Sequence, residues 1–232
     1  MKVGVFDSGV GGLTVLSKLK KKYPLNDYIY YGDTLNIPYG TKDIDTLYSL
    51  SCKIIDFLIS NNVSLIVIAC GTVSSNCYLK LKNKYNIPII DIISPTIEFI
   101  RQEKYNSIGV LATERTVNSH IFKRLLPDIL VYEVNPNSFV PLIESGNIDK
   151  IDVDTYLSKI KSNNIVLGCT HYPLIKDKIK DRNVIDMADN INLDSNNGNR
   201  EVNLYFSKLN NDVLNNIKLF NMDKYNIYEK II

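Results

Sequence analysis

The sequence lacks any long apolar run, since none of its hydrophobic stretches approaches the ~20 residues that are needed to cross a bilayer. It also lacks an N-terminal signal peptide, because Met1-Lys2 leads directly into an expected strand that ends near Asp7. These two absences predict a cytoplasmic protein with no membrane partner.

An excess of charge of one sign is also missing. The chain of 232 residues has 27 Lys and Arg against 25 Asp and Glu, a formal net charge of +2, and its lysines are spread along the chain. This balance gives no electrostatic basis for a nucleic-acid partner. A hydrophobic share of 45% and a charged share of 22% are ordinary for a globular protein that forms one large or two modest domains.

Cysteine is sparse, and none of the four cysteines stands in a CxxC pair. That pattern excludes a disulfide framework and a structural zinc site. The glycines Gly9, Gly11 and Gly12 are not followed by GK[ST] and do not have Rossmann spacing, so no phosphate loop is expected. Nothing in the sequence indicates a metal or pyridoxal phosphate, and the prediction is therefore a protein without a cofactor.

What the sequence does contain is a regular alternation of expected strands and helices. The clearest helical pattern runs from about Asp43 to Ile59. Such alternation predicts an α/β fold with parallel sheets that carry helices on both faces. Strands are expected near residues 2–6, 27–32, 64–69, 87–91, 106–112, 129–134, 164–168 and 183–186.

Two cysteines occupy matching places in the two halves of the chain. Cys70 closes the apolar run 65–69, Cys169 closes the run 165–168, and a helical pattern is expected after each. The offset is 169 − 70 = 99 residues here and 109 − 4 = 105 at the strands that contain Gly4 and Gly109. Two similar buried strands can match by chance, but the recurrence of strand, loop and helix favours a duplicated α/β unit.

The same pattern suggests where the two units divide. The crossover is expected at Ile93-Ser94-Pro95, with Pro95 at the first position of a helix. The turn-rich stretch 194–199 is expected to be a surface loop. A tail with a strand (Val202 to Phe206) and a helix (Asp212 to Phe220) is expected to return to the first unit. The predicted domains are residues 1–93 with 198–232, and residues 94–197.

Both thiols are therefore expected at the C-terminal end of a strand and against a helix N-terminus. Ligands collect there in open α/β sheets, and a cysteine pKa is lowered there. One thiol from each half suits a reaction in which a proton leaves one face of a carbon and returns to the other. A cysteine after an apolar strand is otherwise a small buried hydrophobic residue. Cys52, in an amphipathic helical pattern, and Cys77, about two helical turns past Cys70, are interpreted as such buried residues.

Four segments resemble the glutamate racemases. They are the opening Gly4 to Leu16, the stretch from Tyr31-Gly32-Asp33 to Pro38-Tyr39-Gly40, the run Leu111-Ala112-Thr113 with Thr116, and Gly168 to Leu174. The resemblance spans roughly residues 3 to 190. It implies a racemase that needs no cofactor, with two pseudo-symmetric α/β domains and an active site in the cleft between them. It also implies L- and D-glutamate as substrates, D-glutamate for peptidoglycan synthesis, and a homodimer.

The resemblance also implies roles for individual residues. Cys70 and Cys169 are the expected catalytic acid and base, and Asp7 and His171 assist them. Glu144 matches a family acid close to the second cysteine. The set expected to bind substrate is Ser8, Pro38, Tyr39, Gly40, Gly71, Thr72, Thr113, Thr116, Glu144 and Thr170.

One departure from the family pattern is Gly71, where the family has an asparagine. If a substrate contact has simply been lost, Gly71→Asn is expected to improve turnover of glutamate. If the site has been reshaped for another ligand, the asparagine is expected to clash or to change nothing, and if Gly71 has a positive φ, stability is expected to fall slightly. Three alternatives to glutamate racemisation stay open on the sequence. They are a racemase or isomerase of another small acid such as aspartate, a weak or non-catalytic amino-acid-binding protein, and a hydrolase that uses Cys169 with His171.

Overall fold

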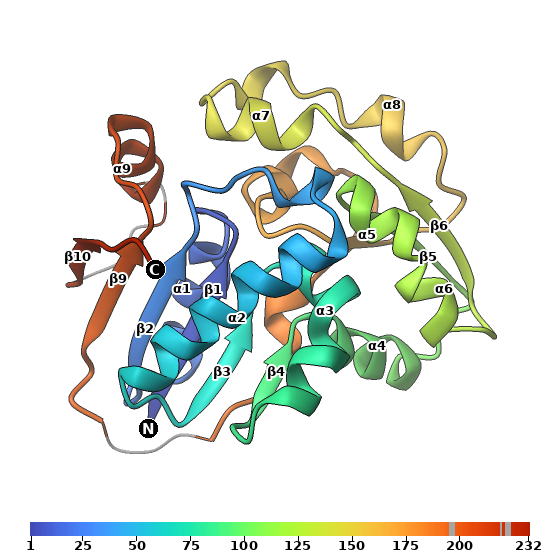
Figure 1. Ribbon diagram of the computed structural model, residues 1–232. Helices are drawn as coiled ribbons and strands as arrows, with labels where there is room; N and C mark the ends of the chain where they lie inside the picture. Colours follow the sequence, from blue (N-terminus) through green and yellow to red (C-terminus); the bar gives the residue numbers. More distant parts are fainter. Residues whose placement is uncertain (195–197, 219, 221–223) are drawn as a thin grey trace.

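The computed structural model describes residues 1–194, 198–218, 220 and 224–232, in which strands and helices alternate (Figure 1). The strands are β1 (Lys2–Asp7), β2 (Asp27–Gly32), β3 (Leu65–Ile68), β4 (Ile89–Asp91), β5 (Ser107–Leu111), β6 (Leu130–Val134), β7 (Asn164–Leu167), β8 (Asn183–Asp186), β9 (Val202–Phe206) and β10 (Asn226–Glu229). The α-helices are α1 (Leu13–Lys22), α2 (Ile44–Ser60), α3 (Gly71–Lys84), α4 (Ile93–Gln102), α5 (Glu114–Ser119), α6 (Ile121–Leu125), α7 (Phe139–Glu144), α8 (Asp154–Leu157) and α9 (Asn211–Lys218). The 3₁₀ helices are η1 (Tyr39–Thr41), η2 (Ile148–Lys150), η3 (Tyr172–Lys178) and η4 (Met187–Asn190).

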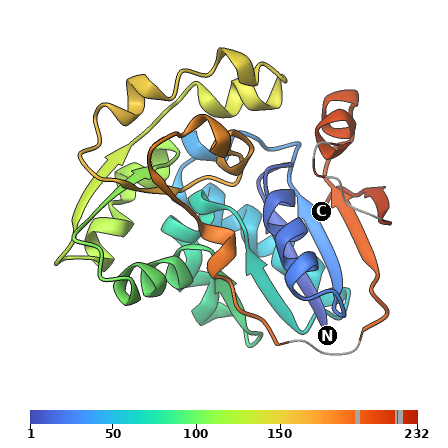
Figure 2. The same cartoon turned by 180° about the vertical axis from the view of Figure 1, so that it is seen from behind.

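The first sheet has six parallel strands in the order β10-β9-β2-β1-β3-β4. Helices cover both of its faces, with α2 and α3 on one side and α1 on the other (Figures 1 and 2). Alternate residues of β1 serve the two faces, because Val5 belongs to the apolar cluster with α1 and Phe6 to the cluster with α2 and α3. Burial on both sides explains why these strands read as continuous apolar runs.

The second sheet has four parallel strands in the order β6-β5-β7-β8. This is the order β2-β1-β3-β4 of the first sheet with each strand replaced by its counterpart in the second half. The parallel α/β fold and the duplicated unit are both confirmed. Cys70 follows β3 and Cys169 follows β7, so the two thiols occupy equivalent positions in the two sheets.

The second repeat differs from the first after its cysteine. A helix of 14 residues, α3, follows Cys70, whereas the seven-residue 3₁₀ helix η3 follows Cys169 and begins only at Tyr172. The expectation that each thiol lies against the N-terminus of an α-helix is therefore wrong for Cys169. Pro173 has no N–H and sits at the start of η3, where a short 3₁₀ turn tolerates it.

The start of α4 also differs from the expectation. The helix begins at Ile93, two residues before Pro95, because the Oδ2 atom of Asp91 accepts hydrogen bonds from the N–H groups of Ile93 and Ser94 at 3.0 Å each. Pro95 then lies inside the first turn, where a missing N–H costs nothing. The expected helix from Asp43 to Ile59 is confirmed as α2, and Asp43 caps it by accepting from the N–H of Thr46 at 2.8 Å.

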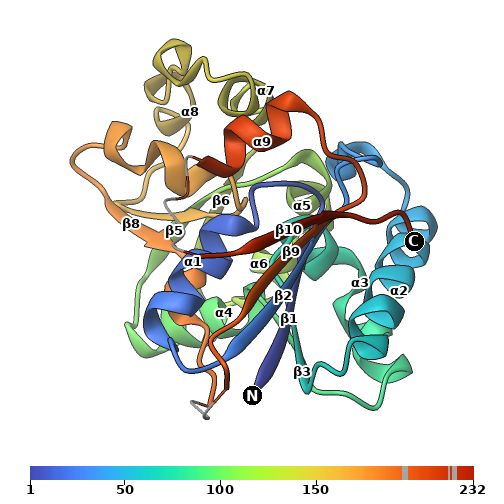
Figure 3. The same cartoon turned by 90° about the vertical axis from the view of Figure 1, so that its left-hand side faces the viewer.

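The C-terminal segment returns to the first sheet. β9 pairs with β2, and β10 extends the sheet beyond β9 (Figure 3). β10 has no counterpart among the expected strands, because it is a short edge strand with mostly exposed side chains. Residues 195–197 of the expected loop, and Leu219 of the expected tail helix, lie outside the described residues. Within the part of the chain that is described, no helix is both long enough and apolar enough to span a membrane.

Candidate active site

The strands that carry the two cysteines end at one cavity of about 430 Å³. Cys70 and Cys169 both line it, although only 4% and 7% of their surfaces are exposed. The volume suits a small ligand, and the placement outside the carboxyl ends of parallel strands is the usual one for a ligand site. A larger hollow of about 740 Å³ lies beside β4 and β8, but no cysteine lines it.

The cavity brings together most of the residues that the sequence singles out. The thiols share its wall with Ser8, Pro38, Tyr39, Gly40, Gly71, Thr72, Thr113, Glu144, Thr170 and His171. Asp7 and Thr116 do not line the cavity, because they lie behind the wall with exposed fractions of 0% and 1%. Cys52 and Cys77 are buried in the core beside α2 and α3, as expected for residues without a catalytic role.

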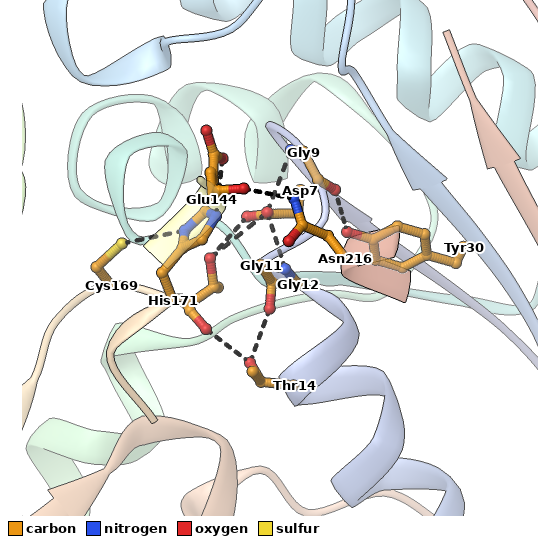
Figure 4. Close-up of polar contacts among 11 residues, drawn as sticks. Asp7, Gly9, Gly11, Gly12, Thr14, Tyr30, Glu144, Cys169, His171 and Asn216 are labelled. Atoms are coloured by element: carbon orange, nitrogen blue, oxygen red, sulfur yellow. Dashed lines mark hydrogen bonds and ion pairs between the residues drawn. The ribbon is translucent and has the colours of Figure 1, made fainter. Parts of the chain in front are cut away.

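Cys169 belongs to a row of three side chains (Figure 4). Its Sγ lies 3.7 Å from Nδ1 of His171, and Nε2 of His171 lies 2.9 Å from Oε1 of Glu144 in an ion-pair contact. Burial lowers the pKa of His171, but the contacts with Cys169 and Glu144 outweigh burial and raise that pKa to about 10. The imidazole of His171 is therefore protonated at neutral pH and stands next to the sulfur of Cys169.

Cys70 has a different environment. It is the N-cap residue of α3, and the N–H groups of Thr72 and Val73 favour its thiolate. Burial and the nearby carboxylate of Asp7 outweigh these N–H groups and raise the pKa of the Cys70 thiol to about 12. The thiol on the side of α3 is therefore protonated at neutral pH, whereas the other thiol lies beside the imidazole of His171.

Asp7 is buried behind the cavity wall and accepts hydrogen bonds from both halves of the chain. Its Oδ2 accepts hydrogen bonds from the N–H groups of Gly9 at 3.2 Å and Gly12 at 2.9 Å, and its Oδ1 accepts from Oγ1 of Thr170 at 3.4 Å. Burial raises the pKa of Asp7, although the charge of His171 and the surrounding N–H groups oppose that rise. Asp7 thus influences both thiols without contacting the cavity.

Hydroxyl groups join the two halves around the cavity. Oγ1 of Thr72 lies 2.9 Å from Oγ1 of Thr113, and Thr113 lies 3.1 Å from Thr116. On the other side Oγ1 of Thr14 donates to the carbonyl of Thr170 at 2.9 Å. We call these contacts, together with the 3.3 Å bond from Ser75 to Thr116, the hydroxyl seam.

Gly11 explains part of the glycine-rich opening of the chain. A Cβ atom at Gly11 would stand 2.5 Å from Oγ1 of Thr170 and 2.6 Å from the ring of His171. A side chain there is therefore incompatible with the packing of the loop after Cys169. Gly11 thus allows the first half to pack closely against Thr170 and His171. This packing role agrees with the expectation that the glycines do not form a phosphate loop.

Gly71 has the same kind of constraint. A Cβ atom at this position would lie 2.5 Å from the backbone carbonyl oxygen of Gly168, a distance that real Cβ contacts do not show. Because the obstacle is backbone and not a flexible side chain, an asparagine does not fit without moving the second half. Among the alternatives for Gly71→Asn, the geometry favours the clash, and the expectation of a positive φ is wrong because Gly71 lies in α3.

Tyr39 and Gly40 form the rim that faces the second half. The hydroxyl of Tyr39 donates to Oδ2 of Asp33 at 2.6 Å, and Asp33 also accepts from Nδ2 of Asn36. Asp33 therefore fixes the loop that leads to Tyr39. It does not line the cavity, so its role is to hold this loop.

Sequence reasoning missed several residues of the wall, three of which lie in the segment between β6 and α7. Nothing in the sequence marked this loop, because it carries neither a thiol nor one of the quoted motifs. The missed lining residues are Ile37, Thr41, Glu114, Asn135, Pro136, Asn137, Val140, Pro141, Gly168 and Tyr172. Among the described residues, no group of three or more His, Cys, Asp or Glu side chains is arranged to hold a metal ion.

Comparison with known proteins gives the chain its relatives. No family model matches the sequence. A glutamate racemase of Hydrogenobaculum is 34% identical to it, with 98% of this chain and 95% of that protein covered. The chain belongs to the glutamate racemase family. The glutamate racemase of Aquifex pyrophilus is 37% identical and covers 94% of this chain and 93% of its own length.

A solved glutamate racemase structure has the same fold. The crystal structure of the Francisella tularensis enzyme in complex with D-glutamate superposes with a TM-score of 0.86 at 31% identity, covering 100% of this chain and 97% of that chain. Membership of the glutamate racemase family makes the chain an amino-acid racemase. The family resemblance of the four sequence segments is thereby confirmed.

Proposed function

We propose that this protein interconverts L- and D-glutamate by proton transfer between two thiols, without a cofactor. The observation that carries the proposal is the pair Cys70 and Cys169, which enter one cavity from equivalent strand ends and have opposite electrostatic surroundings. A base that is a thiolate and an acid that is a thiol are what the two faces of the substrate carbon require.

In the direction from L- to D-glutamate, the Cys169 thiolate takes the α-proton and becomes a thiol. The Cys70 thiol gives its proton to the opposite face of the carbon and becomes a thiolate. His171 stabilises the thiolate at Cys169 before the transfer, and Glu144 supports the charge on His171. In the opposite direction Cys70 is the base and Cys169 the acid.

The remaining predicted residues have roles in holding the substrate. Hydroxyls of Ser8, Thr72, Thr113 and Thr170, with Pro38, Tyr39, Gly40 and the backbone at Gly71, surround the place between the thiols. Thr116 acts through Thr113, with which it is in hydrogen-bond contact at 3.1 Å. Asp7 acts on Cys70 through its charge and on the opposite wall through Thr170.

The proposal extends to the setting of the enzyme. Residues 1–93 with 198–232, and residues 94–197, are the two domains that enclose the substrate; the separate sheets support this division. Four free cysteines agree with a reducing cytoplasm. The product D-glutamate serves peptidoglycan synthesis, and the active protein is a homodimer, which light scattering coupled to size exclusion tests.

Incubation with L-glutamate in deuterated water tests the activity. Loss of the α-proton signal together with the formation of D-glutamate supports racemisation. Exchange with aspartate but not glutamate assigns another substrate. Binding of glutamate without any exchange assigns a binding protein.

A further inference from the structure

The cavity has no cationic side chain for an acidic substrate apart from His171. No Lys or Arg stands among the described residues that line it, and Glu114 and Glu144 add negative charge. His171 is already engaged by Cys169 and Glu144. If the substrate is glutamate, as the proposed function holds, its two carboxylates must be bound mainly by neutral donors, namely hydroxyls, backbone N–H groups and amides.

Position 71 does not provide such a donor. The carbonyl oxygen of Gly168 occupies the space of any side chain there, at 2.5 Å from the place of a Cβ atom. The approach of Gly168 to α3 and the presence of an amide at position 71 exclude each other. A side-chain amide that contacts the substrate therefore lies in another part of the wall.

Asn135 is an unengaged amide in this wall. It is half-buried, it lines the cavity, and in the described part of the chain its side chain has no hydrogen-bond partner. The nearby Asn137 also has an Nδ2 that no described residue engages, with its Oδ1 accepting from the hydroxyl of Tyr156 at 3.4 Å, but it is exposed to solvent. Asn135 thus keeps both N–H groups of Nδ2 available for a ligand.

The position of Asn135 in the sheet indicates which part of the substrate it meets. It directly follows β6 and is level with Ala112, which follows the neighbouring strand β5, since Leu111 pairs with Val134. In the order β6-β5-β7, Asn135 lies two strands from the strand of Cys169, a separation of ~10 Å at the usual strand spacing. It is therefore remote from the reacting carbon and closer to the far end of an extended substrate.

We propose that Nδ2 of Asn135 donates a hydrogen bond to the side-chain carboxylate of the substrate. Asn135 is then a specificity residue of the racemase. It selects dicarboxylic amino acids, while the groups beside Cys70 and Cys169 bind the end of the substrate that reacts.

The test uses the full chain with Asn135→Ala and the isosteric Asn135→Asp. For Asn135→Ala, KM for glutamate is expected to rise by about 5- to 150-fold with kcat little changed, because one hydrogen bond to a charged group is lost. For Asn135→Asp the rise is expected to be larger, because two carboxylates then face each other. Asn137→Ala is the matched variant from the same loop and is expected to lose less than Asn135→Ala.

Competitive inhibition separates a substrate contact from a structural role. Glutarate has the second carboxylate and butyrate lacks it, so Asn135→Ala is expected to weaken glutarate while leaving butyrate unchanged. Equal weakening of both inhibitors, or an unchanged KM for glutamate, overturns the assignment of Asn135. A parent protein that exchanges no glutamate proton refutes the proposed function itself, which is a different outcome from failure of this inference.

Discussion

Nδ1 of His171 lies 3.7 Å from Sγ of Cys169, whereas Cys70 is subject to the negative charge of Asp7. The two thiols therefore have different electrostatic surroundings although they occupy equivalent places in the two sheets. Such a difference suits a racemase, because two thiols or two thiolates in the same site leave either the base or the acid missing.

Replacement of either thiol by a hydroxyl is expected to abolish racemisation. In Cys70→Ser and in Cys169→Ser, the serine is far less acidic than the thiol and is rarely ionised as a base. The measurement is the formation of D-glutamate from L-glutamate, with the melting temperature as the control for folding. A hydrolase that uses Cys169 with His171 is spared by Cys70→Ser, so near-normal turnover in that variant refutes the two-thiol mechanism.

The pH profile of kcat/KM is expected to fall above about pH 10, where His171 loses its proton, since its pKa is raised to about 10. The Cys70 thiol has its pKa raised to about 12 and titrates later. Glu144→Gln removes the charge that supports the imidazolium, so the fall is expected to move to lower pH. A profile that Glu144→Gln leaves in place contradicts the role of this ion pair.

The same pKa of His171 makes stability depend on pH. Its stabilising contribution is complete below the unfolded pKa of about 6.5 and is lost as pH rises through about 10. Between these values the folded state binds more protons, and the free energy of unfolding is expected to fall by up to ~1.4 kcal/mol per pH unit from this group. Urea titrations at several pH values measure the slope, which is expected to be shallower in His171→Gln.

Gly71→Asn is expected to lower kcat/KM, although it restores the family residue. The Cβ atom alone meets the carbonyl of Gly168, so Gly71→Ala is expected to be harmful as well. Overpacking of this kind costs about 1–3 kcal/mol, which here acts against the approach of the two halves. Steady-state racemisation of both enantiomers is the measurement, and a rise in kcat/KM for Gly71→Asn contradicts the steric argument.

The C-terminal helix contributes to the row that ends at Cys169. Nδ2 of Asn216 in α9 donates to the backbone carbonyl of Glu144 at 3.1 Å (Figure 4). Asn216→Ala is expected to reduce kcat/KM about 3- to 10-fold, the effect of one hydrogen bond worth ~1 kcal/mol. Asn215→Ala is the matched control, because Asn215 is exposed and, among the described residues, bonds only to Lys218, at 3.4 Å. Equal effects in both variants assign the change to the helix as a whole.

The sequence predicted the sheets and the thiols because their signals are local. Continuous apolar runs mark β3 and β7. The cysteine that follows each run lies at the C-terminal end of its strand, and this placement does not depend on the rest of the chain. The positions of Asp7, Gly71 and Asn135 depend instead on how the halves meet. Asp7, which was expected to assist the cysteines, is buried behind the cavity wall. The obstruction at Gly71 comes from a carbonyl 97 residues away in the chain (168 − 71). Local patterns carry no information about such contacts.

The composition of the hydroxyl seam bears on how substrate enters and leaves. Thr72, Thr113 and Thr14 join the halves through hydroxyl groups, each of which water satisfies nearly as well, so that separating one such pair costs only ~1 kcal/mol. Away from the cavity the halves share an apolar cluster that includes Leu13 and Met187. The seam is thus the weaker of the two junctions. We expect glutamate to enter and leave the cavity when water replaces the hydrogen bonds of the seam, while the apolar junction stays closed.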